Sequence, residues 1–166
     1  MHGFQLWVNF PAAQERIRPR DQEIPGALLP VVRRKDGRAR GRIIAGEALG
    51  TKAVIDTHTP ITLHHWTLAT NVDLSLPIPS NQQVIRYVFS GQAESQDTQI
   101  EEGQMVTYGS GGSIELRGPG SADARLIAGE PVREPMARMG PFGMNMREEL
   151  VEAHYDYQAG RLGRIT

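Results

Sequence analysis

At 166 residues and a formal net charge of −1, the chain has the length of a single domain with its own core. Apolar residues make up 39% of it and no apolar run is long enough to span a bilayer, which excludes disordered and membrane-spanning classes. The absence of cysteine excludes disulfides, thiolate metal sites and cysteine nucleophiles. The near-neutral charge argues against a nucleic-acid partner, and the lack of an export signal predicts a cytoplasmic protein.

Alternation of apolar and polar residues is the dominant pattern along the chain. It predicts a first strand over residues 4–10, FQLWVNF, which stops at Pro11. Further strands are predicted over residues 27–32, 39–45, 61–69, 72–76, 84–89, 104–108, 113–116 and 124–127. Many short strands between glycine-rich turns are typical of an all-β sandwich or small barrel.

The segment RRKDGRARGR, residues 33–42, carries six basic residues in ten. One interpretation is a patch that contacts phosphate. The favoured interpretation is a solvated hairpin that turns at Lys35-Asp36-Gly37, because Asp-Gly suits the positive φ angles of tight turns.

One segment near the end predicts a helix, over about residues 146–159. Asn145 can serve as the N-cap with Glu148 three residues later, and apolar residues then recur at helical spacing until Gly160. A short basic tail, GRLGRIT, follows.

Three stretches of the sequence together resemble the pirin family. They are GFQLWVNFPAAQERIRPRDQEIP (3–25), LIAGEPVREP (126–135) and GPFGMNMREELVEAHYDYQAGRLGRI (140–165). Pirins are bicupins with quercetin 2,3-dioxygenase-like members, and the motif order resembles their C-terminal half only. The resemblance implies an all-β fold, a single cupin (RmlC-like) β-barrel with one C-terminal α-helix. It divides the chain into a linking strand and loop (1–26), the cupin barrel (27–135), and the helix and tail (136–166).

The resemblance also implies that this half lacks the family's metal site. In complete members the N-terminal cupin, the half that this chain does not resemble, holds an iron-type ion through a His-x-His pair and a later His-x-Glu pair, and the segment around residues 77–91 resembles the pattern of that first barrel. Aligned backwards from the Ser90-Gly91 turn, LPIPSNQQVIRYVFSG places the first pair at Pro77 and Pro79, and the later histidine falls near Leu116. Proline and leucine side chains offer no ligand atom, so we expect no metal and no cofactor on this chain alone.

The stretch HTPITLHHWTL, residues 58–68, is the remaining candidate for a metal site. His64 and His65 are adjacent on a predicted strand, so their side chains point to opposite faces. His58 lies roughly 20 Å from His64 if the segment is extended. Structural or surface roles are therefore favoured over ligation for His58, His64 and His65.

Residues of the strand that follows Pro79 are candidates for lining the barrel interior. Tyr87 and Phe89 share parity with the two prolines, and Gln83 lies on the same side. These three residues are predicted to face inward, in a cavity that is filled rather than open.

The predicted function is that of a metal-free binding or structural module. Because the two cupins of the family pack face to face, a C-terminal half is expected to form a homodimer or to pair with an N-terminal pirin half. The alternative is enzymatic: the chain belongs to a metal-dependent quercetin 2,3-dioxygenase whose catalytic half, with Fe or a similar divalent metal, is encoded separately or truncated. We expect no catalysis from this chain alone, and a gene fragment is a third possibility.

Overall fold

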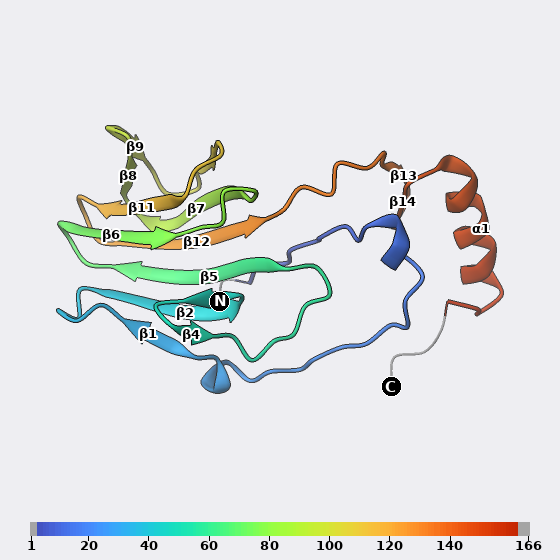
Figure 1. Ribbon diagram of the computed structural model, residues 1–166, viewed down its shortest axis with the longest axis horizontal. Coiled ribbons are helices and arrows are strands. Elements are labelled where there is room, and N and C mark those ends of the chain that lie inside the picture. The colour runs from blue at the N-terminus through green and yellow to red at the C-terminus, as the bar shows by residue number, and fades with distance from the viewer. Residues whose placement is uncertain (1–2, 163–166) are drawn as a thin grey trace. The chain divides into compact units, whose positions relative to one another are not determined.

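The computed structural model describes residues 3–162, and the chain divides into two compact units. One unit combines the residues up to Glu23 with those from Val132 onward, and the other runs from Ile24 to Pro131. The second unit contains the two large sheets and is shown with its strands labelled in Figure 1. No helix within residues 3–162 is long and apolar enough to cross a membrane.

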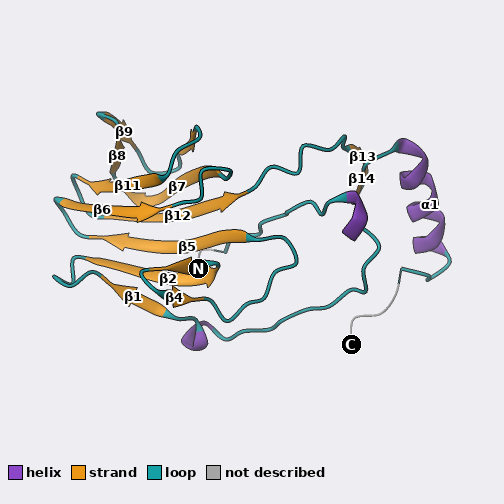
Figure 2. Ribbon diagram, viewed as in Figure 1, coloured by secondary structure: helices purple, strands orange, loops and turns teal. Residues whose placement is uncertain are grey.

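Two sheets make up the second unit, and Figure 2 shows how completely strands dominate it. The six-stranded sheet has the order β1 (Val31–Arg33), β2 (Ala39–Ala45), β5 (Ile61–Leu68), β12 (Ala122–Gly129), β7 (Gln83–Gly91) and β10 (Met105–Tyr108). The four-stranded sheet has the order β6 (Val72–Pro77), β11 (Ser113–Gly118), β8 (Ala93–Ser95) and β9 (Thr98–Ile100). A small hairpin of β3 (Glu47–Ala48) and β4 (Thr51–Lys52) completes the unit.

The core lies between the two sheets. Along β5 and β12 every second residue is buried, as expected for strands with one face against a core. Trp66 and Leu126 of the six-stranded sheet belong to the same buried cluster as Leu74 and Leu116 of the four-stranded sheet. The all-β prediction is confirmed, although the described strands form two separate sheets and not one closed ladder.

Most predicted strands are present within two residues at either end, and β2 matches at both ends. The strand predicted at 27–32 is shorter, because Gly26–Leu28 forms a 3-10 turn after Pro25 and pairing starts only at Val31. The short strands β3, β4, β8 and β9 were not predicted, because two or three residues are too few for a visible alternation.

The strand predicted over residues 4–10 is wrong. These residues form no ladder in the described part of the chain, and Phe4, Leu6 and Val8 are each more than 40% exposed. Alternation gives a segment two different faces, but a strand also needs a neighbour to satisfy its backbone groups.

The basic segment forms the predicted hairpin. β1 and β2 pair antiparallel with Arg33 opposite Arg40, and Gly37 takes a φ of +73° in the turn. Arg34 Nη1 donates to the backbone oxygen of Asp73 (2.8 Å), and Arg38 donates to that of Thr70. Both arginines thus bind the neighbouring β5–β6 region, as a structural hairpin should.

The first unit contains the one α-helix of the described residues, α1 (Arg147–Gln158), a hairpin of β13 (Ala137–Met139) and β14 (Phe142–Met144), and a 3-10 turn at Ala12–Gln14. The predicted cap is wrong by one residue. Met146 is the N-cap, and its backbone N–H donates to Glu149 Oε2 (2.8 Å). Asn145 instead donates through Nδ2 to Glu134 Oε2 (2.7 Å). The predicted tail, 160–166, extends beyond the described residues.

Close packing against Trp66 explains why residue 41 is glycine. An ideal Cβ at Gly41 would lie 2.6 Å from Trp66 Cη2, and Trp66 is fully buried. We expect Gly41→Ala to lower the free energy of unfolding by about 2 kcal/mol, because the indole would have to shift within the core. Gly109→Ala is the control, since nothing lies within 4 Å of its added Cβ. Equal losses in urea unfolding of the two variants would contradict this explanation.

Candidate functional site

The three positions that the resemblance aligns with the metal ligands of the family's N-terminal cupin lie in two different environments. Pro77 at the end of β6 and Pro79 just after it are exposed, while Leu76 and Ile78 beside them are buried. Leu116 on β11 is 1% exposed and packs in the core. Two outward-facing prolines and one core leucine present no nitrogen or carboxylate oxygen, so these residues do not fit a metal ion.

The histidines of residues 58–68 do not converge either. His64 points into the core and is 1% exposed, His65 points to the opposite face of β5, and His58 is exposed before the strand. Within residues 3–162 there is no group of three His, Asp or Glu side chains that could hold a metal ion.

His64 is a buried, neutral histidine. Its strand neighbours on the same face are Ile43 and Leu126, and neither ring nitrogen makes a full hydrogen bond to another described residue. Burial lowers the pKa of His64 to about 4, against a weaker opposing effect of the Ala45 backbone. The side chain is therefore uncharged near neutral pH and part of the scaffold.

The strand β7 faces the core with the residues opposite to those predicted. Val84, Arg86 and Val88 are buried, and the predicted cavity-lining residues Gln83, Tyr87 and Phe89 lie on the other face. The inward prediction for these three is wrong. It assumed that bulky side chains mark the core, but the core side of β7 carries two valines around a buried arginine.

Arg86 connects the two sheets from inside. It is 0% exposed, and its guanidinium donates to two backbone oxygens of the four-stranded sheet: Nη1 to Glu94 (3.0 Å) and Nη2 to Arg117 (3.0 Å). Glu94 and Arg117 are the register pair that joins β8 to β11. Burial lowers the pKa of Arg86, and Tyr108 opposes this effect. These contacts indicate a structural role for this cation.

The outer face of the six-stranded sheet, opposite the core, is the most chemically varied surface of this unit. One row across it carries Arg42 on β2, His65 on β5, Arg125 on β12 and Tyr87 on β7, by the strand registers. A second row, Leu63, Ile127 and Ile85, is aliphatic. Both rows are half-buried, so this face combines a cationic and an apolar strip.

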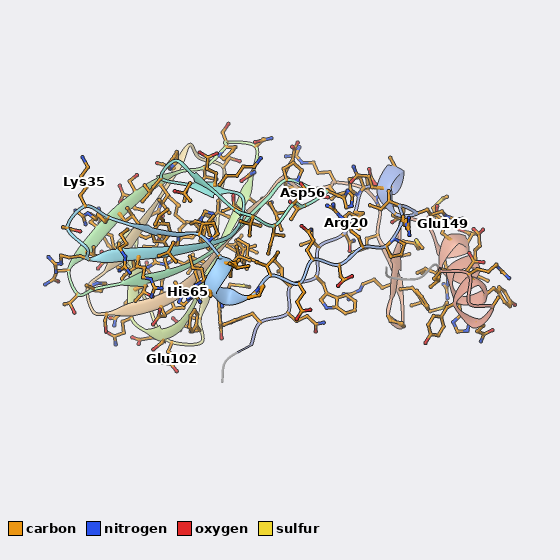
Figure 3. The ribbon with its side chains drawn as sticks, turned by 90° about the horizontal axis from the view of Figure 1, so that it is seen from below. Arg20, Lys35, Asp56, His65, Glu102 and Glu149 are labelled. Atoms are coloured by element: carbon orange, nitrogen blue, oxygen red, sulfur yellow. The ribbon has the colours of Figure 1, made fainter. Side chains whose placement is uncertain are left out.

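His65 is held in place on this face. Its Nε2 lies 2.8 Å from Asp123 Oδ1, which also accepts from Thr67 Oγ1 (2.7 Å). Phe89, at a bulge where β7 slips against β12, lies 5.1 Å from the His65 ring. The view in Figure 3 labels His65 among the side chains of these strands.

The outer face of the four-stranded sheet is polar. Arg117 lies near three carboxylates: Glu115 at 3.1 Å, Asp73 at 3.4 Å and Glu94 at 3.8 Å. Two hollows of about 350 and 300 Å³ lie beside it, and Glu94 and Arg117 line both. Because the arginine is already surrounded by acid, this face offers no free charge for an anionic substrate.

The first unit has a hollow of about 520 Å³ with an apolar lining that includes Ile17, Phe142 and Met144. The cations at its rim are paired, Arg16 with Glu152 and Arg161 with Asp156. Two carboxylates, Glu15 and Asp156, also line the hollow, but within residues 3–162 they belong to no group of three potential metal ligands.

Comparison with known proteins decides the family. The family model "Pirin C-terminal cupin domain" matches residues 63–163, more than half of the chain. The chain belongs to the pirin family. It is 34% identical over 98% of its length to human pirin, and 29% identical over 96% to a putative quercetin 2,3-dioxygenase of Vibrio cholerae.

The fold agrees with that membership. A crystal structure of quercetin 2,3-dioxygenase from Acinetobacter baumannii superposes with a TM-score of 0.86 at 26% identity, and it covers 96% of this chain. The prediction of a single all-β cupin domain of the pirin type is confirmed. The chain spans 57% of human pirin, 58% of the Vibrio cholerae relative and 56% of the Acinetobacter baumannii structure.

Sequence reasoning missed the residues that give the outer face its character. Arg42 was seen only as part of a basic run, and Asp123 and Arg125 were not singled out. Sequence reasoning also missed the buried Arg86 on the core side. The alternation of Arg40-Gly41-Arg42 places both arginines on one side of a strand and could have found one half of the row. The position of Arg125 in the same row as Arg42 depends on the order of the strands in the sheet.

Proposed function

We propose that this chain is a metal-free, pirin-type C-terminal cupin that acts as a binding and structural module for a second cupin half. The proposal is carried by Pro77, Pro79 and Leu116, which the resemblance aligns with the metal ligands of the family's N-terminal cupin. Without ligand atoms there, a dioxygenase metal would have to be held by residues outside this sequence.

The outer face of the six-stranded sheet supports the pairing. Its aliphatic row of Leu63, Ile127 and Ile85 lies away from the core of its own unit, which is the arrangement expected of an interface. Covering such surface is worth roughly 25 cal/mol per Å² before the costs of association.

The metal-free state is tested by metal analysis of the full chain. After dialysis against a chelator, inductively coupled plasma mass spectrometry should find far less than one iron, nickel or zinc per chain. Near-stoichiometric metal would overturn the proposal and make His58, His64 and His65 candidate metal ligands again.

Pairing is tested by co-expression. The probe is the part of the Vibrio cholerae relative that lies outside its match to this chain. Size-exclusion chromatography with light scattering should show a one-to-one complex with the full chain. Separate elution of both at high concentration would contradict the pairing.

A second candidate function is catalytic, and the likeness to a solved quercetin 2,3-dioxygenase favours it. In that case this chain is the non-catalytic part of an enzyme whose metal-binding half is supplied by another polypeptide. Quercetin turnover by the co-expressed pair, and by neither part alone, is the expected result. An inactive but well-formed pair would leave only the structural role.

A further inference from the structure

Arg42 and Arg125 lie on either side of His65 on the outer face of the six-stranded sheet. Both residues are register partners of His65, so one strand separates them and their Cα atoms are roughly 10 Å apart. Two arginine side chains of this length can reach the space above the His65 ring from both sides. Repulsion by Arg42 contributes to a lowered pKa of Arg125, behind the larger effect of burial, which agrees with their proximity.

Neighbouring side chains position Arg125 and His65, whereas Arg42 keeps an unpaired donor. The Arg125 guanidinium lies 5.5 Å from the centre of the Phe89 ring, and the same ring contacts His65. Asp123 is occupied by His65 and Thr67. The Nε of Arg42 is buried and has no hydrogen-bond partner among the described residues. A half-buried guanidinium with an unpaired donor calls for an acceptor.

The charge of this face also restricts its partner. Four arginines project from it: Arg33, Arg40, Arg42 and Arg125. Among the residues of the six strands β1, β2, β5, β12, β7 and β10, Asp123 is the one acidic residue on this face, so the face carries four arginines and one acidic side chain. Two copies stacked through this face about a two-fold axis would bring arginines against arginines. A partner with an acidic face avoids that repulsion.

We propose that Arg42 and Arg125 form a carboxylate receptor that binds an Asp or Glu side chain of the partner polypeptide at the centre of this face. The inference rests on the proposed pairing. It adds to that interface a charged hydrogen-bonded contact that lies between apolar contacts. Planar guanidinium groups suit carboxylates because each can donate two parallel hydrogen bonds.

The first test uses acetate as the probe and the full chain alone. In ¹H–¹⁵N spectra, the Nε–H signals of Arg42 and Arg125 should move together with one midpoint as sodium acetate replaces sodium chloride at constant ionic strength. Arg42→Gln should weaken the acetate binding detected at the Arg125 signal about fivefold. Arg40→Gln, two residues away on the same strand and face, is the matched control and should leave it unchanged. Signals that do not move, or that move no more than that of Arg40, would overturn the receptor.

The second test measures the affinity of the full chain for the Vibrio cholerae probe described above, and the expected changes below are changes in this affinity. Arg42→Gln and Arg125→Gln should each weaken it about tenfold, whereas Arg40→Gln should not, and thermal unfolding checks that each variant is folded. A complex insensitive to both variants would overturn the inference while leaving the pairing intact. Acetate binding without any complex would contradict the pairing and identify a free carboxylate as the ligand.

Discussion

Mild acid should destabilise the strand-rich unit through a single buried histidine. Below pH 6.5, the ordinary pKa of histidine, the unfolded chain takes up a proton at residue 64. The folded chain does not do so until about pH 4, because burial lowers the pKa of His64. The contribution of His64 to stability is therefore constant above pH 6.5 and falls as the pH decreases toward 4.

The size of this effect follows from the two pKa values. The difference between 6.5 and about 4 corresponds to about 3 kcal/mol of unfolding free energy lost at the acidic end. Replacing His64 with a residue that cannot take up a proton should make the unfolding free energy depend less on pH between 6.5 and 4. The leucine variant, His64→Leu, should match or exceed the wild-type stability at neutral pH, because it also removes two nitrogens that lack hydrogen-bond partners.

The measurement is urea unfolding from pH 4.5 to 8. Trp66 is fully buried in this unit and Trp7 lies in the other, so a Trp7→Phe background makes fluorescence report on the right transition. The exposed His58→Gln, in the same unit, is the matched control and should keep the wild-type slope. An unchanged slope in His64→Leu would show that the acid sensitivity arises elsewhere.

Loss of Arg86 should be the most damaging single change in the interior. In Arg86→Ala the backbone oxygens of Glu94 and Arg117 each lose a charged donor, and a cavity replaces a fully buried side chain. We expect a loss of about 4 kcal/mol in unfolding free energy. Arg86→Met should lose less, because it fills most of the space and removes the cost of burying a charge.

A local readout separates this explanation from a general loss of packing. The pair Glu94 and Arg117 is the register contact between β8 and β11, so amide exchange should accelerate first over β8 and β9. Arg33→Met, on the exposed side of β1, should change neither stability nor exchange. A stability within about 1 kcal/mol of wild type in Arg86→Ala would contradict a structural role.

Several elements were predictable because their signals are local. Strands such as β2, β5 and β12 alternate over seven or eight residues, long enough for the period to be read. The Asp36-Gly37 turn carries its own chemistry. The family likewise follows from runs of adjacent residues, such as those around Gly140–Asn145.

The orientation of β7 shows where local signals fail. Its two faces both contain large side chains, and the bulkier set, with Tyr87 and Phe89, lies outside. Which face is buried depends on which sheet packs against it. Two backbone oxygens of another sheet accept hydrogen bonds from the buried Arg86 and so help to stabilise its charge there.

The sequence by itself determined the all-β class, the pirin resemblance and the absence of ligand atoms at residues 77, 79 and 116. These depend on side-chain identity and on short-range periodicity. Only the tertiary structure decided which side of β7 faces the core, that residues 4–10 form no strand, and that Arg42 and Arg125 flank His65 on neighbouring strands. Those features arise from pairing between strands distant in the chain, and strand order and register are set by packing the whole sheet.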